Sequence, residues 1–482
     1  MAKYKENISV HLQENMDYMK NTIHIGENFD IIYRVVMIGG QQACLYMIDG
    51  FTKDEILQKL LESFNKQSTD HFPATAHEMS KTMIPYGEIS LLRNYDDLLR
   101  NLFSGVTILF IDGYSEAIAI DCRSYPSRGV DQPEKEKVMR GSRDGFVETL
   151  VFNTALIRRR IRNPELMMES FVIGEISQTD VVISYMRNRV NPQILKDLKH
   201  KLQTIRVDAL TMNQESLAEC LYPRNWFNPF PKFRFSERPD TSAASILEGS
   251  IVILVDNSPA AMIIPTTVFD IIEDADDYYF PPITGTYLRL SRLIINIAAV
   301  LLTPTFLLLL NHPEWIPQSL QFIIITDPVN IPILLQLLIL EFAIDGLRLA
   351  SLSTPSMLST PLSVVAGIVL GDFTVSSGWF NSEIMLYMAF VAIANYTQSS
   401  FELGYALKFM RILLLCLTAF FDIWGYGIGI IITITAIVTN KTIGGKSYID
   451  PLIPFHPRQF MKRILRIPLP VDERLRRGNG QN

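Results

Sequence analysis

The chain has 482 residues, with 44 Lys and Arg against 50 Asp and Glu, and a formal net charge of −6. This length predicts roughly three folded units, and the mildly acidic balance without a basic patch excludes nucleic acid as the main partner. Its four cysteines, which have no paired spacing, exclude a disulfide framework and a zinc site: Cys44, Cys122, Cys220 and Cys416.

Residues 1–122 are predicted to form a first α/β subdomain. The stretch 29–48 (FDIIYRVVMIGGQQACLYMI) indicates two short strands joined by a Gly-Gly turn. A helix is expected from Thr52 to Phe64, with Thr52 as its cap. Residues 106–120 indicate a second strand pair around Asp112-Gly113. No apolar signal segment opens the sequence, so this half is expected to stay on the cytoplasmic side.

A polar linker at 123–140 is predicted to lead into a second α/β subdomain at 141–285. Its expected elements are a helix at 146–162, a strand at 181–186, a helix at 192–205 and a hairpin at 251–264. The hairpin region is too short for a bilayer and is broken by Asp256-Asn257-Ser258-Pro259. The basic end of the first helix, Arg158 to Arg162, is open to two interpretations. One is a solvated face that compensates the helix dipole, and the other is contact with an acidic surface or lipid headgroups.

Residues 286–440 are predicted to be an all-α polytopic membrane domain. A first span covers Leu293–Leu310, and Arg289 and Arg292 before it place its start in the cytoplasm. The tail at 441–482 is basic, which predicts a cytoplasmic C-terminus.

Four further apolar segments follow the first span. Five full spans would put the basic tail outside, so we expect four complete spans plus one re-entrant or surface-lying segment. The weakest span is the first of the four, because it is broken at Asp327-Pro328. The segments are 320–340, 358–375, 384–396 joined with 401–407, and 412–438.

No catalytic constellation is present in the sequence, so no enzyme activity, cofactor or metal is expected. The run Gly444-Gly445-Lys446-Ser447 resembles the end of a phosphate loop, but the required earlier glycine is replaced by Asn440. Gly425, Gly427 and Gly429 lie in an apolar segment and are predicted to serve helix packing.

Ionisable side chains within the apolar segments are the candidate functional residues, because such groups usually face a bundle interior or an aqueous path. The spacing of Glu341, Asp345 and Arg348 places them on one helix face, and their pairing with one another or with nearby basic residues remains open. Glu314 and Glu383 are predicted as outer-mouth acids that concentrate cations. The predicted intramembrane polar network is Asp327, Glu341, Asp345 and Arg348.

The segment at 358–375 is richest in small residues, with Ser363, Gly367 and Gly371 recurring every four positions. It is consistent with a narrow pore wall and equally with a tightly packed core helix. The predicted pore-lining residues are Thr360, Ser363, Val364, Gly367, Gly371 and Asp372.

The chain resembles the A-subunit family of spore germination proteins, the GerA family. Within the membrane half, 353–373 (STPSMLSTPLSVVAGIVLGDF) and 393–411 (IANYTQSSFELGYALKFMR) are similar to the SpoVAF-type branch. Five stretches of the first 292 residues carry the resemblance: 141–166 (GSRDGFVETLVFNTALIRRRIRNPEL), 235–240 (FSERPD), 248–265 (EGSIVILVDNSPAAMIIP), 276–279 (DDYY) and 285–292 (GTYLRLSR).

The resemblance implies an oligomeric, pentameric ion channel of the spore inner membrane that passes monovalent cations and amplifies the response of nutrient germinant receptors. It implies a pore helix at Pro361–Val375, in which Asp372 departs from the nutrient-receptor pattern. Expected partners are further copies of the chain, membrane lipids, a small membrane subunit and germinant receptor complexes. Two alternatives are a non-conducting scaffold and a transport subunit that uses the broken segment at Asp327–Pro332.

Overall fold

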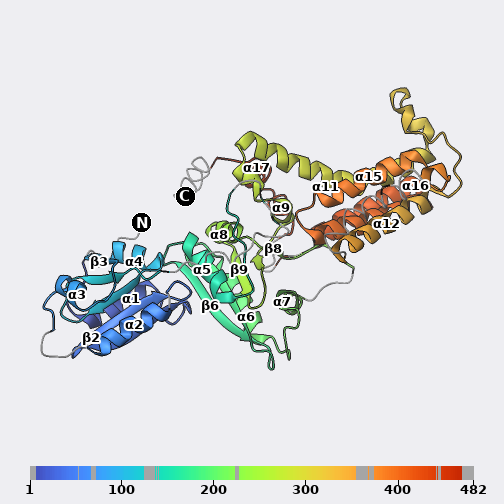
Figure 1. Cartoon of the computed structure of the whole chain (residues 1–482). Coiled ribbons are helices and arrows are strands. Elements are labelled where there is room, and N and C mark those ends of the chain that lie inside the picture. The colour runs from blue at the N-terminus through green and yellow to red at the C-terminus, as the bar shows by residue number, and fades with distance from the viewer. Residues whose placement is uncertain are drawn as a thin grey trace. The chain divides into compact units, whose positions relative to one another are not determined.

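The computed structural model describes residues 7–52, 54–66, 72–123, 136, 138, 141–222, 227–353, 367, 374–440, 442 and 447–468. Contacts divide the chain into two compact units. The first unit holds residues 1–223 and 233–265, and the second holds 224–232 and 266–482. Figure 1 draws the sheets of the first unit in blue and green and the helices of the second in yellow to red. Residues 266–285, predicted to close the second subdomain, therefore group with the C-terminal helices instead.

The first sheet has the strand order β1-β2-β4-β5-β3, and its paired strands are antiparallel. The predicted Gly-Gly hairpin is confirmed, since Gly39 and Gly40 both have positive φ between two paired strands. The predicted strand pair around Asp112-Gly113 is confirmed by the pairing of β4 with β5. The strands are β1 Ile31–Ile38, β2 Gln41–Ile48, β3 Ile89–Leu92, β4 Thr107–Ile111 and β5 Ala117–Ile120.

Helices cover both faces of this sheet, as the alternation of β2 side chains requires. Cys44 and Tyr46 lie in the core shared with α1 and α4, whereas Ala43 and Leu45 lie in the core shared with α2 and α3. The expected cap at Thr52 is wrong, because Thr52 forms a β-bridge with Arg123. The helices are α1 Leu12–Thr22, α2 Asp54–Asn65, α3 Ala76–Thr82 and α4 Tyr95–Phe103.

The second sheet has the order β6-β7-β9-β10-β8, again with antiparallel neighbours. The predicted hairpin at 251–264 is confirmed by the pairing of β9 with β10, and α5 and α8 share one hydrophobic core with the sheet. The strands are β6 Leu166–Ile173, β7 Thr179–Met186, β8 Arg234–Ser236, β9 Ile251–Val255 and β10 Ala261–Ile264. The helices are α5 Leu150–Arg160, α6 Pro192–Thr204, α7 Gln214–Leu221 and α8 Pro239–Glu248.

Arg158 of α5 joins the two sheets within the first unit. Its guanidinium donates to both carboxylate oxygens of Asp30 at 2.8 Å and to the Leu166 carbonyl at 3.0 Å. The side chain is fully buried and lies over the ring of Phe103. Both sequence interpretations of this basic helix end are therefore wrong for Arg158, because a buried charge needs a fixed partner and finds it here.

The second unit is helical in its described residues. Two of its helices, α11 and α16, are long and apolar enough to cross a membrane. Its elements are α9 Val268–Ile272, α10 Asp276–Tyr279, α11 Pro282–Asn311, η2 Pro313–Trp315, η3 Gln318–Ile323, α12 Ile333–Ser353, α14 Thr374–Ser376, α15 Ser382–Tyr396, α16 Phe401–Thr439 and α17 Pro457–Ile464.

Helix α16 is two antiparallel helices folded on one another at Asp422, which has φ 52° and ψ −132°. A straight helix of 39 residues would be about 58 Å long. Instead, the backbone of Gly425 lies against the Leu417 carbonyl, and that of Gly429 lies against Leu414. The expectation that these two glycines serve helix packing is confirmed, whereas a Cβ on Gly427 would have no neighbour within 4 Å.

The fourth and fifth predicted spans are therefore divided at the wrong place. Residues 401–407 are predicted to continue the segment before them. In the structure, the Ser400 hydroxyl instead accepts from the Leu403 amide and caps a new helix there. The chain then runs through Lys408 and Arg411 to the reversal at Asp422.

Side-chain contacts fix the directions of these helices. Ala299 and Asn311 of α11 contact Arg411 and Asp422 respectively, so α11 runs parallel to the first arm of α16. Helix α12 runs the opposite way, because Glu341 contacts Arg411 and the later Asp345 contacts Lys408. Helices α12 and α15 run in the same direction, since Gln336 and Asn381 near their starts are hydrogen-bonded. The end of α12 and the start of α15 thus lie at opposite ends of the helical unit.

Candidate functional site in the helical unit

Most of the predicted pore wall lies outside the described residues: Thr360, Ser363, Val364, Gly371 and Asp372. Gly367 is described, has helical backbone and is exposed in the single chain. The pore assignment therefore remains a prediction, and the structure identifies candidate residues on the described helices of the second unit.

The interior of the helical unit holds a cluster of four charged side chains, contributed by α12 and α16. Arg411 donates to Glu341 through two nitrogens, one at 2.9 Å, and to the Ala299 carbonyl of α11 at 2.7 Å. Lys408 pairs with Asp345 and lies 3.6 Å from Glu341. Two acids thus face two bases, which is the condition for burying charge at tolerable cost.

The remaining two members of the predicted network lie elsewhere. Arg348 is 9% exposed and its guanidinium lies 4.4 Å from the ring centre of Phe401 and 5.0 Å from that of Tyr405. Asp327 is exposed in the irregular segment before α12. Helix α12 therefore directs its acids to cations of α16 and its arginine to aromatic rings.

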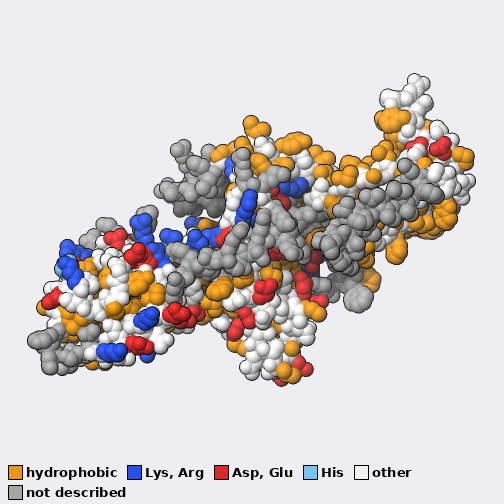
Figure 2. Space-filling view, viewed as in Figure 1, with side chains coloured by type: hydrophobic (Ala, Val, Ile, Leu, Met, Phe, Trp, Pro, Cys, Tyr) orange, Lys and Arg blue, Asp and Glu red, His pale blue; other side chains and the backbone are white. Residues whose placement is uncertain are grey.

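Carboxylates gather at the end of the helical unit where α11 stops and α15 starts, which we call the distal end. Glu314 in η2 is 64% exposed and accepts from the His312 ring at 3.0 Å. The other ring nitrogen of His312 lies 2.6 Å from Asp422, at the reversal of α16. Glu383 lies in the first turn of α15 and is half-exposed. On the face that Figure 2 shows, red acidic side chains lie at the tip of these helices among orange hydrophobic ones.

Electrostatics at the distal end follow from these contacts. Hydrogen bonds from the ring to Asp422 and Glu314 raise the pKa of His312 above its ordinary value. The pKa of Glu314 is lowered by a backbone hydrogen bond and by the His312 ring. These contacts therefore favour the protonated form of the His312 imidazole and the ionised form of Glu314.

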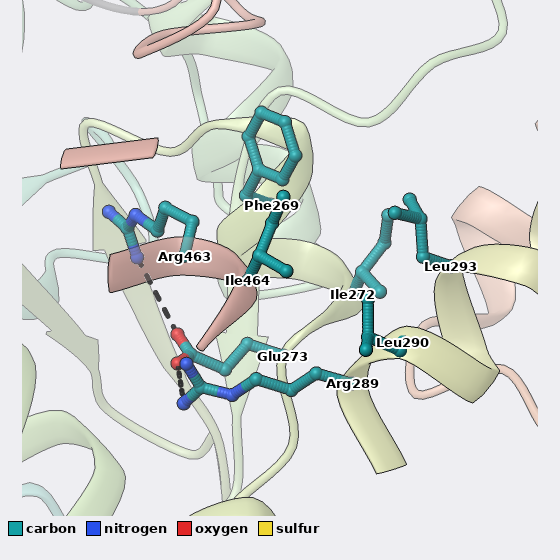
Figure 3. A pocket seen from close by; sticks show the side chains of 8 residues that line it. All are labelled: Phe269, Ile272, Glu273, Arg289, Leu290, Leu293, Arg463 and Ile464. Atoms are coloured by element: carbon teal, nitrogen blue, oxygen red, sulfur yellow. Dashed lines mark hydrogen bonds and ion pairs between the residues drawn. The ribbon is translucent and has the colours of Figure 1, made fainter. Parts of the chain in front are cut away.

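A second charged group lies where α11 begins. Glu273 accepts from Arg289 of α11 and is 3.5 Å from Arg463 of α17, so it links the two helices (Figure 3). The same figure shows Phe269, Leu290 and Ile464 among the apolar side chains that line the adjoining pocket. Asp277 is fully buried, and its carboxylate lies 2.8 Å from the guanidinium of Arg292. Burial raises the pKa of this carboxyl. Arg289 and Arg292, predicted as markers of the cytoplasmic side, are thus held in ion pairs.

Sequence reasoning missed the side chains that hold the helices in register. Gln336 donates to Asn381 at 2.9 Å, and Gln398 donates to Asn296. His312 was also missed as the partner of Asp422 and Glu314. No sequence signal identifies such pairs, because they depend on which residues of two separate helices lie at the same height.

Comparison with known proteins relates this chain to one family. The model of the Bacillus/Clostridium GerA spore germination protein family matches residues 17–477. Stage V sporulation protein AF of Bacillus subtilis is 34% identical over 95% of this chain and 92% of its own length. Spore germination protein B1 of Bacillus subtilis is 27% identical over 96% of this chain and 95% of its own length.

One solved structure is also similar. The N-terminal domain of the A subunit of the Bacillus megaterium spore germinant receptor GerK3 is 28% identical, with a TM-score of 0.42. The match covers 55% of this chain and 97% of that chain.

Proposed function

The chain belongs to the Bacillus/Clostridium GerA spore germination protein family, and from this premise we propose that it is a subunit of an ion channel that acts during spore germination. The channel passes monovalent cations across the spore inner membrane and amplifies the response of nutrient germinant receptors. Its subunits form a ring of further copies, five in the arrangement that the resemblance implies. A small membrane subunit and germinant receptor complexes are its proposed partners.

The carboxylates of the distal end support this proposal most directly. Glu314, Glu383 and Asp422 lie at this end. Between residues 293 and 407 the sequence contains a single Lys or Arg, which is Arg348. Arg348 contacts Phe401 and Tyr405 at the other end of the helices. Repeated around a ring, such acids attract cations to the mouth of a pore and repel anions.

The directions of the described helices support a topology with an even number of crossings. Helix α11 and the first arm of α16 run toward the distal end, while α12, α15 and the second arm of α16 run away from it. Since α12 ends opposite the start of α15, the chain has to return between 353 and 382, which contains the apolar segment predicted at 358–375. We therefore propose six crossings in place of four with a re-entrant segment, with both termini on the core side of the membrane.

The scaffold alternative is supported by the cluster of four charged side chains between α12 and α16. All four of its charges are matched between the two helices, so this cluster has the composition of a structural tie and not of an ion path. A scaffold would assemble through these helices without conducting. The transport alternative needs an acid of the broken segment to bind a coupling ion inside the helical unit. Asp327 in that segment is exposed, which does not favour such a site.

Potassium efflux from proteoliposomes that contain the purified full chain distinguishes channel from scaffold. The native chain is compared with Gly367→Leu and Asp372→Asn in the predicted pore and with the double variant Glu314→Gln, Glu383→Gln at the distal end. Glu55→Gln and Glu215→Gln, two acids of the first unit, form the matched control. The channel proposal expects efflux from the native and control proteins, a changed or absent efflux for Gly367→Leu, and reduced cation preference for the distal variant. Absence of efflux from every form, with the partner subunit supplied, would favour the scaffold.

A further inference from the structure

The segment that precedes α17 exposes consecutive apolar residues. Leu452, Ile453 and Phe455 are 42%, 50% and 59% exposed, and Pro454 between them is also exposed. Water-facing surfaces seldom carry such a run, and where one occurs it usually marks a binding surface. We call residues 452–455 the apolar loop.

Helix α17, directly after the apolar loop, is amphipathic and basic. Arg458 is exposed, Met461 is 55% exposed, and Phe460 packs between Phe269 and Phe455 with ring centres 6.1 and 5.8 Å apart. The sequence from 451 to 468 contains Arg458, Lys462, Arg463 and Arg466 and no acidic residue. Exposed apolar groups next to an exposed positive charge, here Arg458, are typical of helices that lie in the headgroup layer of a membrane.

Helix α17 is fixed to the beginning of α11. Arg289 of α11 donates to the Lys462 carbonyl at 3.2 Å, and the Arg466 amide donates to the Thr286 hydroxyl at 3.1 Å. Arg463 pairs with Asp270 and also with Glu273, as Figure 3 shows. These bonds hold α17 at the height of the first turns of α11, just before its continuous apolar stretch starts at Leu293.

The first turns of α11 add apolar surface at the same height. Ile283 and Tyr287 are 86% and 68% exposed. A tyrosine and an isoleucine at the polar end of a membrane helix suit the boundary between headgroups and acyl chains. The loop, α17 and this part of α11 thus belong to one level of the helical unit.

We propose that residues 452–465 form an interfacial anchor that lies in the membrane leaflet at the start of α11. The apolar loop enters the acyl region, and Arg458 lies at the level of the lipid phosphates. A leaflet containing anionic phospholipid is the partner, because the exposed Arg458 adjoins the apolar loop and the segment is attached to a membrane helix at its polar end. The inference rests on the proposed membrane placement of α11.

Lipid contact can be measured on the full chain in nanodiscs with an environment-sensitive fluorophore and nitroxide-labelled lipids. The fluorophore is attached to Phe455→Cys, or to Ile453→Cys as a second anchor position, in a background with Cys220→Ser and Cys416→Ala. Ile297→Cys on α11, 52% exposed, tests the membrane placement itself. Val172→Cys, 64% exposed on β6, is an apolar control site in the first unit.

We expect quenching by lipid nitroxides at Ile297 and at the anchor positions, and none at Val172. Quenching at Ile297 with none at either anchor position would overturn the anchor while the membrane placement stands. An unquenched probe at Ile297 would overturn the membrane placement and the anchor together.

The role of charge is tested by comparing phosphatidylcholine nanodiscs with nanodiscs that also contain phosphatidylglycerol. The anionic lipid is expected to increase quenching at Phe455, and Arg458→Gln is expected to reduce this increase. Lys196→Gln, which removes an exposed positive charge from α6, should leave it unchanged. An equal response of both variants to phosphatidylglycerol would overturn the assignment of Arg458 to the lipid phosphates.

Discussion

Arg411 and Glu341 form a two-point ion pair in the interior of the helical unit, where their side chains are 0% and 3% exposed. The same guanidinium reaches the Ala299 carbonyl, so one side chain ties α16, α12 and α11 together. Loss of either partner leaves the other charge buried without its two-point hydrogen-bonded counterion and leaves the four-charge cluster unbalanced.

Loss of either partner should therefore be strongly destabilising. We expect Glu341→Gln and Arg411→Met each to lower the free energy of unfolding by about 3–5 kcal/mol. The double variant should lose less than the sum of the two, because it leaves no unpaired charge. Unfolding in detergent micelles, followed as a double-mutant cycle, measures this coupling.

An exposed pair provides the contrast for this measurement. The side chain of Arg93, which pairs with Glu116, is 81% exposed. Arg93→Gln should cost about 0–1 kcal/mol, since water and salt screen such pairs. Strictly additive losses for Glu341 and Arg411 would contradict the interior pairing.

The tight reversal of α16 makes a second prediction, about glycine. A Cβ at Gly425 would overlap the Leu417 carbonyl oxygen, which is backbone and cannot rotate away. We expect Gly425→Ala to destabilise the helical unit by about 1–3 kcal/mol through overpacking. Gly429→Ala should cost less, because the atom nearest its Cβ is the end of the Leu414 side chain.

Gly427→Ala is the matched control, because no atom lies within 4 Å of the added Cβ. It should be neutral or stabilise the helix by up to about 1 kcal/mol, the difference in helix propensity. Thermal unfolding of the three variants in one detergent ranks them. If Gly427→Ala were as damaging as Gly425→Ala, the close approach of the two arms would be wrong.

Sequence periodicity identified the hairpins well, because their signals are local. Gly39-Gly40 and Asp256-Asn257 stand directly between the strands that they join. The reversal at Asp422 has no comparable signal, since the apolar composition continues through it. The error at Arg158 has the same physical origin, because its partner Asp30 is 128 residues away and only the folded chain brings the two together.

The Arg158–Asp30 pair makes a third prediction, about the first unit. Both side chains are nearly fully buried between the two sheets, at 0% and 2% exposed. Asp30→Asn keeps the shape of the side chain but removes its charge and should lower the free energy of unfolding of the first unit by about 3–5 kcal/mol. Hydrogen exchange of β1 and α5 amides in the full chain measures this loss.

Asp144→Asn is a suitable control for Asp30→Asn. Asp144 also pairs with an arginine of α5, Arg160, but both of its members are partly exposed, at 25% and 21%. Its effect should be clearly smaller because water reaches the pair. Equal protection losses in the two variants would contradict a special role for the buried contact.

The last prediction concerns the pH dependence of the contact between α11 and the reversal of α16. An ionised carboxylate only accepts hydrogen bonds, and the two ring nitrogens of His312 lie 2.6 Å from Asp422 and 3.0 Å from Glu314. A ring protonated at both nitrogens can donate to both carboxylates at once, which is the cause of the raised pKa of His312. A group whose pKa is higher in the folded state stabilises that state at low pH. This stabilisation is complete below the unfolded pKa of about 6.5 and is lost as pH rises through the higher folded value.

We expect the amides around Asp422 to exchange faster with deuterium as pH rises above about 6.5, once the intrinsic pH dependence of exchange is subtracted. His312→Gln should remove this pH dependence, because a neutral amide keeps one donor but no titrating charge. His200→Gln, on the exposed face of α6, should leave it intact. A His312→Gln protein with the native pH profile would show that the contact at Asp422 does not depend on the imidazole, and that the reversal is held by Asn311 and backbone packing alone.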